Sequence, residues 1–161
     1  MKSALPIFVF LAIRIAASAQ ANPETPNYNG NVYAKAFTGT CQHGYLLYGG
    51  GGGAEGILWK GISVGGEVSY QAFSDGWGLT YFTVQPGFHF NGRKRTTKWD
   101  PFISLGLGGA ISNHGGYGGT SNFGGGFNYW FKDRTALRFD VRAQAVGEEA
   151  MVVFGFGVSF R

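Results

Sequence analysis

Residues 123–145, FGGGFNYWFKDRTALRFDVRAQA, decide the expected fold, because their second half alternates between two kinds of side chain. The charged set occupies every second position: Arg138, Asp140 and Arg142. The apolar set stands between and around them: Leu137, Phe139, Val141 and Ala143. Successive side chains of a β-strand point to opposite faces. The stretch therefore predicts a strand with one charged face and one apolar face, and the fold depends on which of them points outward.

The same alternation continues along the rest of the chain. From residue 31 onward, the sequence divides into alternating segments separated by turn-forming residues, and none of them combines helical periodicity with helix caps. The expected strands are residues 31–40, 44–57, 61–73, 78–91, 101–112, 121–131, 136–145 and 151–161. The pattern is typical of an all-β domain.

Composition decides which face is outside. Over the last six expected strands every charge lies on one face, and the opposite face is broad, aromatic and uncharged. Only 14% of all residues are charged, whereas a soluble domain carries about 25%. The polar face is too thin to coat a soluble protein, so the apolar face is expected to meet hydrocarbon and the polar face to line a lumen. Because hydrocarbon leaves no backbone group unpaired, the sheet must close. The prediction is an eight-stranded antiparallel up-and-down transmembrane β-barrel.

A barrel of eight strands is just wide enough for side chains to fill it. Inward glycines leave room for long side chains from the far wall. The expected lumen charge network is Lys35, Glu67, Arg138, Asp140 and Arg142. Since the third and seventh strands face each other across the axis, Glu67 is predicted to pair with Arg138 or Arg142. The glycine run 49–53 leaves the parity of the second strand open, and Pro86 predicts a bulge or an edge-like position.

The N-terminal residues are predicted to be a targeting signal. A basic start, an apolar run from Ala4 to Ile13 and the small residues Ala17-Ser18-Ala19 are the parts of a secretory signal peptide, expected to span residues 1–19. Residues 20–30 are rich in turn formers and predict a flexible lead-in. One barrel domain is expected over residues 31–161, and no stretch in it has about 18 consecutive apolar residues.

Three motifs of this chain are similar to a known family. GGGFNYWFKDRTALRFDVR, WDPFISLGLGGA and the closing VVFGFGVSFR resemble the small eight-stranded outer-membrane barrels of the OmpA-type and related outer membrane protein β-barrel families, over residues 31–161. The resemblance implies a structural barrel in the outer membrane of a Gram-negative-type cell. It also implies a monomer that contacts outer-membrane lipids and lipopolysaccharide and is inserted by the barrel assembly machinery.

The sequence offers little for catalysis. His43, His89 and His114 have no ligand spacing, and with Cys41 as the single cysteine neither a metal nor another cofactor is expected. The net charge of +4 is too small to predict nucleic-acid binding. We therefore expect no enzyme. The alternatives are a barrel enzyme that modifies lipid A, hinted at by Ser112-Asn113-His114, and a surface-interaction barrel, while a soluble lipocalin-like carrier is the second choice of fold.

Two sets of residues are expected at the membrane interfaces. With the usual periplasmic N terminus, the turn that carries Arg93, Lys94, Arg95 and Lys98 would face the periplasm, where each basic residue near anionic headgroups could contribute about 1 kcal/mol. The tryptophans stand at or near strand ends, where girdles of interfacial aromatic residues belong. They are Trp59, Trp77, Trp99 and Trp130.

Overall fold

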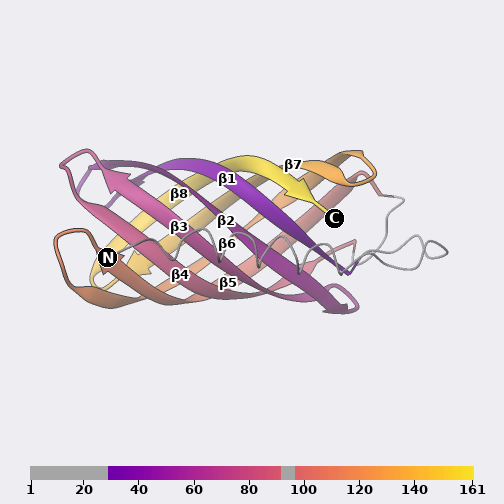
Figure 1. The fold of residues 1–161 in the computed structure, drawn as a ribbon, viewed down its shortest axis with the longest axis horizontal. Coiled ribbons are helices and arrows are strands. Elements are labelled where there is room, and N and C mark those ends of the chain that lie inside the picture. The colour runs from indigo at the N-terminus through magenta and orange to yellow at the C-terminus, as the bar shows by residue number, and fades with distance from the viewer. Residues whose placement is uncertain (1–28, 92–96) are drawn as a thin grey trace, which may run out of the picture.

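The chain folds into eight β-strands in a computed structural model that describes residues 29–91 and 97–161. The strands are β1 (Gly30–Cys41), β2 (Leu46–Trp59), β3 (Ile62–Phe73), β4 (Gly78–His89), β5 (Trp99–Ser112), β6 (Tyr117–Lys132), β7 (Thr135–Val146) and β8 (Glu149–Phe160). Each strand pairs antiparallel with the next, and β8 pairs back with β1, so that the sheet closes (Figure 1). The predicted fold class is confirmed.

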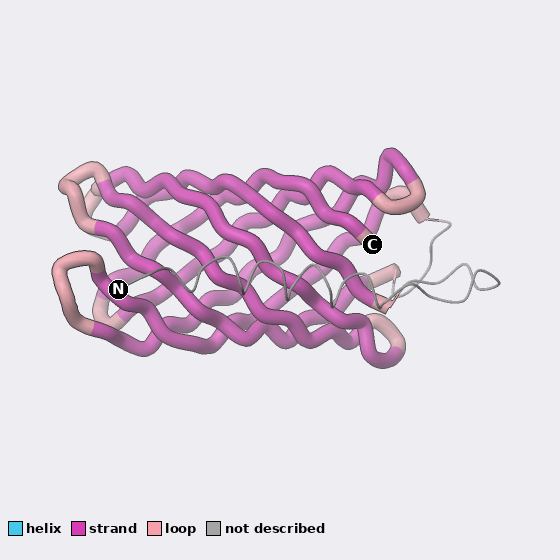
Figure 2. Tube along the Cα trace, viewed as in Figure 1, coloured by secondary structure: helices cyan, strands magenta, loops and turns pink. Residues whose placement is uncertain are grey.

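Short turns join the long strands wherever the structure describes the whole connection, as Figure 2 shows. Five strands begin earlier than the sequence predicts, namely β1, β5, β6, β7 and β8, and the difference is largest for β6, which begins at Tyr117. The glycines of GGYGG lie between two expected strands, but Gly118 pairs with Ala110 and Gly119 with Gly109. Glycine weakens a strand without preventing its ladder, so a glycine run is a poor strand boundary. Among the described residues, no helix is long and apolar enough to cross a membrane.

Several sequence predictions fall on residues that the structure does not describe. They are the signal peptide over residues 1–19, most of the lead-in over residues 20–30, and Arg93, Lys94 and Arg95.

Burial alternates along the strands and answers the question of the two faces. On β7, Arg138 and Asp140 are only 1% and 3% exposed, whereas Val141 between Asp140 and Arg142 is 48% exposed. The charged face therefore points into the barrel and the apolar face points out. The same alternation fixes β2, in which Leu47 and Ile57 are buried. Glu55, two residues before Ile57, consequently points inward.

The barrel has two distinct ends. The end at which β1 begins and β8 finishes, called the terminal end, carries the connections around residues 60–61, 90–98 and 133–134 and lies at the right of Figure 1. The other, called the turn end, carries residues 42–45, 74–77, 113–116 and 147–148. Each end holds a buried apolar cluster. The turn-end cluster is Phe37, Cys41, Leu47, Met151 and Val153. The terminal-end cluster is Ile57, Trp130 and Ala136.

One prediction about a single residue is wrong. Trp130 is 3% exposed and packs inside the barrel, unlike Trp59, Trp77 and Trp99, which are exposed near strand ends. Its position has inward parity on β6, just before the register shift between Trp130 and Lys132. Of the two alternatives predicted for Pro86, the structure has the edge-like position and not the bulge. The β4–β5 ladder omits residues 85 and 86 and resumes at Gly87↔Ser104 in the same register, because proline has no N–H to donate.

Candidate functional site

The lumen contains a central ion-pair group formed by Lys35, Glu67, Asp140 and Arg142, on strands β1, β3 and β7. Lys35 Nζ lies 3.0 Å from Glu67 Oε2 and 3.3 Å from Asp140 Oδ1. Arg142 closes the ring, with Nη1 at 2.9 Å from Glu67 Oε2 and Nε at 3.0 Å from Asp140 Oδ1. Two cations thus share two carboxylates across the axis, and the Glu67–Arg142 contact is one that the sequence predicts.

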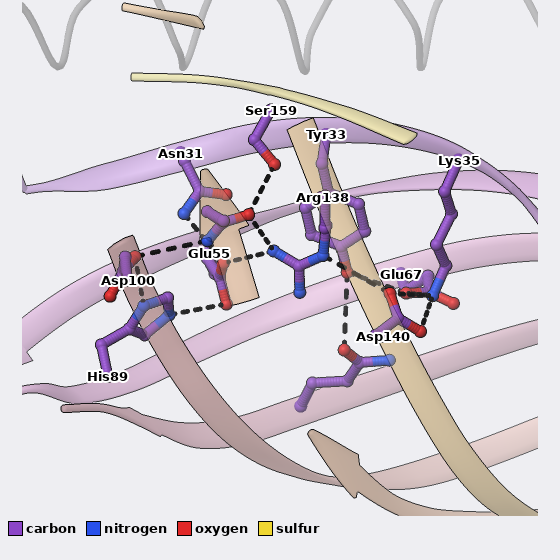
Figure 3. Close-up of polar contacts among 12 residues, drawn as sticks. Asn31, Tyr33, Lys35, Glu55, Glu67, His89, Asp100, Arg138, Asp140 and Ser159 are labelled. Carbon is purple, nitrogen blue, oxygen red and sulfur yellow. Dashed lines mark hydrogen bonds and ion pairs between the residues drawn. The ribbon is translucent and has the colours of Figure 1, made fainter. Parts of the chain in front are cut away.

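Tyr33 completes the shell of Glu67. Its hydroxyl donates to Glu67 Oε2 over 2.8 Å and lies 3.4 Å from Gln85 Oε1 (Figure 3). The ring has room because Gly53 stands opposite on β2, where an added Cβ would come within 2.6 Å of the tyrosine oxygen. A carboxylate buried in this way needs its partners, since an unpaired buried charge is very costly.

A terminal-end group of charges lies beside the central group and is built on Arg138. Arg138 Nη1 donates to Glu55 Oε1 over 3.0 Å, and its guanidinium lies 4.1 Å from the ring centroids of Tyr33 and Phe102. Arg138 Nε lies 3.6 Å from Asp140 Oδ2, which links the two groups. Stacked between two rings and paired with two carboxylates, this guanidinium fills the middle of the barrel.

His89 extends the terminal-end group between two carboxylates. Its Nδ1 lies 2.9 Å from Asp100 Oδ2 and its Nε2 lies 3.3 Å from Glu55 Oε2, as Figure 3 shows. Asn128 Nδ2 donates to Asp100 Oδ2, and Asn128 Oδ1 accepts from Ser159 Oγ. The lumen thus contains four carboxylates, and with Lys35, Arg138 and Arg142 a protonated His89 would bring the formal sum to zero.

Three residues of these groups were absent from the predicted network: Glu55, His89 and Asp100. The sequence contains the signal for two of them. His89 has the parity of the polar face of its strand, and extending the inward series Phe102, Ser104 back by one step reaches Asp100. Glu55 gives no such signal, because glycines surround it on β2 and hide the alternation.

The residues considered for catalysis lie at the turn end. The Ser112 Oγ accepts a hydrogen bond from the backbone N of His114, while the imidazole contacts Asn113 Oδ1 at 2.7 Å and lies tilted against the Trp77 ring, with 5.0 Å between the ring centroids. The serine thus meets the backbone of this histidine, whereas a general base would have to meet it with its ring. Within residues 29–91 and 97–161, no group of three or more His, Cys, Asp or Glu residues could hold a metal ion.

Comparison with known proteins finds the same fold in solved structures. The neisserial surface protein A (NspA) has a TM-score of 0.66 and 13% sequence identity, covering 81% of this chain and 96% of that one. The outer membrane protein OprG of Pseudomonas aeruginosa has a TM-score of 0.63 and 8% identity, covering 86% and 98%. No protein-family model and no curated protein sequence matches the chain. The chain has the fold of the small eight-stranded outer-membrane β-barrels.

One similar structure is that of an enzyme. The outer membrane enzyme PagL has a TM-score of 0.56 and 13% identity, covering 80% of this chain and 99% of that one. Because one fold can serve different functions, function has to be argued from the residues of this chain.

Proposed function

We propose that the chain is a structural outer-membrane β-barrel protein with a side-chain-filled lumen, without a wide channel and without catalysis. The observation that carries this proposal is the pairing of an apolar outer face with an interior in which Lys35, Glu67, Asp140 and Arg142 are all paired and almost fully buried. A soluble carrier of the lipocalin type would need the reverse arrangement, with its apolar residues inside.

The outer face supports a place in a lipid bilayer. Large apolar residues on it are exposed on strand after strand, for example Val68, Val84, Leu107, Phe123 and Phe154. A closed ladder satisfies the backbone groups that hydrocarbon would leave unpaired. The proposed location is the bacterial outer membrane, reached through a cleaved signal peptide. The proposed partners are outer-membrane lipids, lipopolysaccharide and the barrel assembly machinery, and the barrel is proposed to be a monomer.

Gel migration after membrane fractionation tests the location. The protein should require detergent for extraction and should migrate differently unboiled and boiled, because a closed barrel resists dodecyl sulfate until it is heated. Recovery from the soluble fraction without detergent, with one migration at both temperatures, would contradict the proposal.

Mass spectrometry of lipid A tests the absence of catalysis. The folded barrel should leave lipid A unchanged, because the contacts of His114 with the described residues include neither a hydroxyl nucleophile at the imidazole nor a carboxylate to orient it. Gain or loss of one acyl chain, abolished by His114→Ala, would make the chain an enzyme instead. A surface-interaction role finds less support, because the turn-end connections are short.

A further inference from the structure

The charged side chains outside the lumen are sorted between the two ends of the barrel. The described cations at the terminal end are Lys60, Lys98, Lys132, Arg134 and Arg161, and Asp133 is the one acidic residue described there. The turn end has the opposite composition. Its acidic residues are Asp75, Glu148 and Glu149, and its described connections contain neither lysine nor arginine.

Most of these cations are available to a partner. Lys60, Lys98, Lys132 and Arg134 are exposed, and all of them lie in or beside the connections of the terminal end. Arg161 is more restrained, because its Nε donates to the Asp133 carbonyl and its guanidinium stacks 4.0 Å above the Trp130 ring. Asp133 is one carboxylate among several cations, so the terminal end remains strongly positive.

Exposed tryptophans accompany the cations. Trp59 is 63% exposed and Trp99 is 53% exposed, and both stand at the terminal-end limits of their strands. The Lys60 ammonium lies 4.6 Å from the Trp59 ring centroid, and Lys98 directly precedes Trp99. Tryptophan prefers the boundary between hydrocarbon and headgroups, and a lysine beside it can extend its ammonium toward the headgroups. The two kinds of residue thus form a single rim.

We propose that this basic rim, formed by Lys60, Lys98, Lys132 and Arg134 with Trp59 and Trp99, is a docking surface for the phosphate headgroups of an anionic lipid leaflet. Charge complementarity selects the occupant, because clustered cations at a membrane surface attract anionic lipids. The rings fix the depth at which the cations meet them. The turn end, with carboxylates at the same positions relative to the bilayer, has no such preference. The proposal rests on the proposed membrane location and adds a lipid class and a side to it.

Tryptophan quenching by brominated lipids in vesicles measures lipid preference at each end. The barrel is refolded into mixtures in which either phosphatidylglycerol or phosphatidylcholine carries the bromine. A Trp77→Phe variant reports the terminal end through Trp59 and Trp99, and a Trp59→Phe/Trp99→Phe variant reports the turn end through Trp77. We expect phosphatidylglycerol to associate about fivefold more strongly than phosphatidylcholine at the terminal end, the factor for one basic residue, and equally at the turn end.

Charge variants decide whether the rim causes the preference. Lys60→Gln, Lys98→Gln, Lys132→Gln and Arg134→Gln combined should weaken it, as should high salt on the unaltered rim, since salt screens exposed charges. The matched control, Asp75→Asn/Glu148→Gln/Glu149→Gln, should leave it unchanged. A preference that the combined variant leaves unchanged would overturn the proposal, as would equal association of the two lipids at the terminal end.

Two further measurements distinguish lipid binding from the binding of free phosphate and from a failure to insert into the bilayer. Inorganic phosphate, added at constant ionic strength, should not displace phosphatidylglycerol from the basic rim. Displacement would mean that the rim is a site for free phosphate and not a surface for lipid. If neither brominated lipid quenches Trp59 or Trp99, the protein is not in the bilayer, and both this inference and the proposed function fail.

Discussion

At the scale of the residue, one oxygen of Glu67 has three partners in the lumen, since Lys35, Arg142 and the Tyr33 hydroxyl all contact its Oε2. Removing one partner of a buried ion pair leaves the other charge uncompensated, at a cost of about 3–5 kcal/mol. We expect Glu67→Gln and Arg142→Gln each to lower the free energy of unfolding by about that amount if water stays out. The double variant should lose much less than the sum. Urea unfolding in detergent measures all three.

A matched control for this cycle is Glu149→Gln, which breaks an exposed contact of 2.9 Å with His43 at the turn end. It should change stability by no more than about 0.5 kcal/mol. Additive losses for Glu67→Gln and Arg142→Gln, with no coupling between them, would mean that the two side chains do not meet in the lumen.

Some of these lumen residues could be predicted from the sequence alone and others could not. The Glu67–Arg142 contact is predictable because charges alternate with large apolar residues on β3 and β7, and strands four apart in an eight-stranded barrel face each other. Glu55 is unpredictable because parity is visible only where side-chain character alternates, and β2 is mostly glycine around it. The prediction that Trp130 belongs to the interfacial girdle was wrong because a tryptophan at a strand end can face the membrane interface or pack inside the end of the barrel.

At the scale of the element, β2 is a strand whose glycines make space for its neighbours. A Cβ at Gly53 would lie 2.6 Å from the Tyr33 oxygen and 2.4 Å from the Gly66 carbonyl oxygen. Gly53→Ala should therefore push Tyr33 away from Glu67 and lower the free energy of unfolding by about 1–3 kcal/mol, the usual cost of overpacking. Equilibrium unfolding in detergent measures this change in the free energy of unfolding.

The control for Gly53 lies on the neighbouring strand. Gly66 points outward, and its nearest neighbour to an added Cβ would be the Thr83 carbonyl oxygen at 3.7 Å, an ordinary contact. Gly66→Ala should be neutral or slightly stabilising, because alanine restricts the unfolded chain more than glycine does. Equal losses for both variants would show that the cost comes from replacing any glycine of the sheet and not from the clash with Tyr33.

At the scale of the whole molecule, side chains block the lumen at three successive levels along the barrel axis. The turn-end cluster, the linked charge groups and the terminal-end cluster follow one another from end to end. Closure and the two faces could be predicted from alternation, because hydrocarbon demands them. The apolar clusters could not, since inward apolar residues such as Trp130 and Val153 are few among polar ones and gather only when the register between distant strands is known.

Because side chains block the lumen at three levels, the barrel is predicted not to conduct ions, even when one of these levels is opened. Unaltered protein in a planar bilayer should give no discrete current steps, because the Arg138 guanidinium lies between two rings in mid-lumen. Trp130→Ala should also stay silent, since it opens the terminal-end cluster and leaves every ion pair in place, although it should cost about 3–5 kcal/mol of stability as a large cavity. A porin in the same bilayer controls for recording, and heat-modifiable migration controls for folding. Current steps from Trp130→Ala alone would mean that the linked charge groups leave a continuous path for ions, and that the aromatic cluster is what closes the barrel.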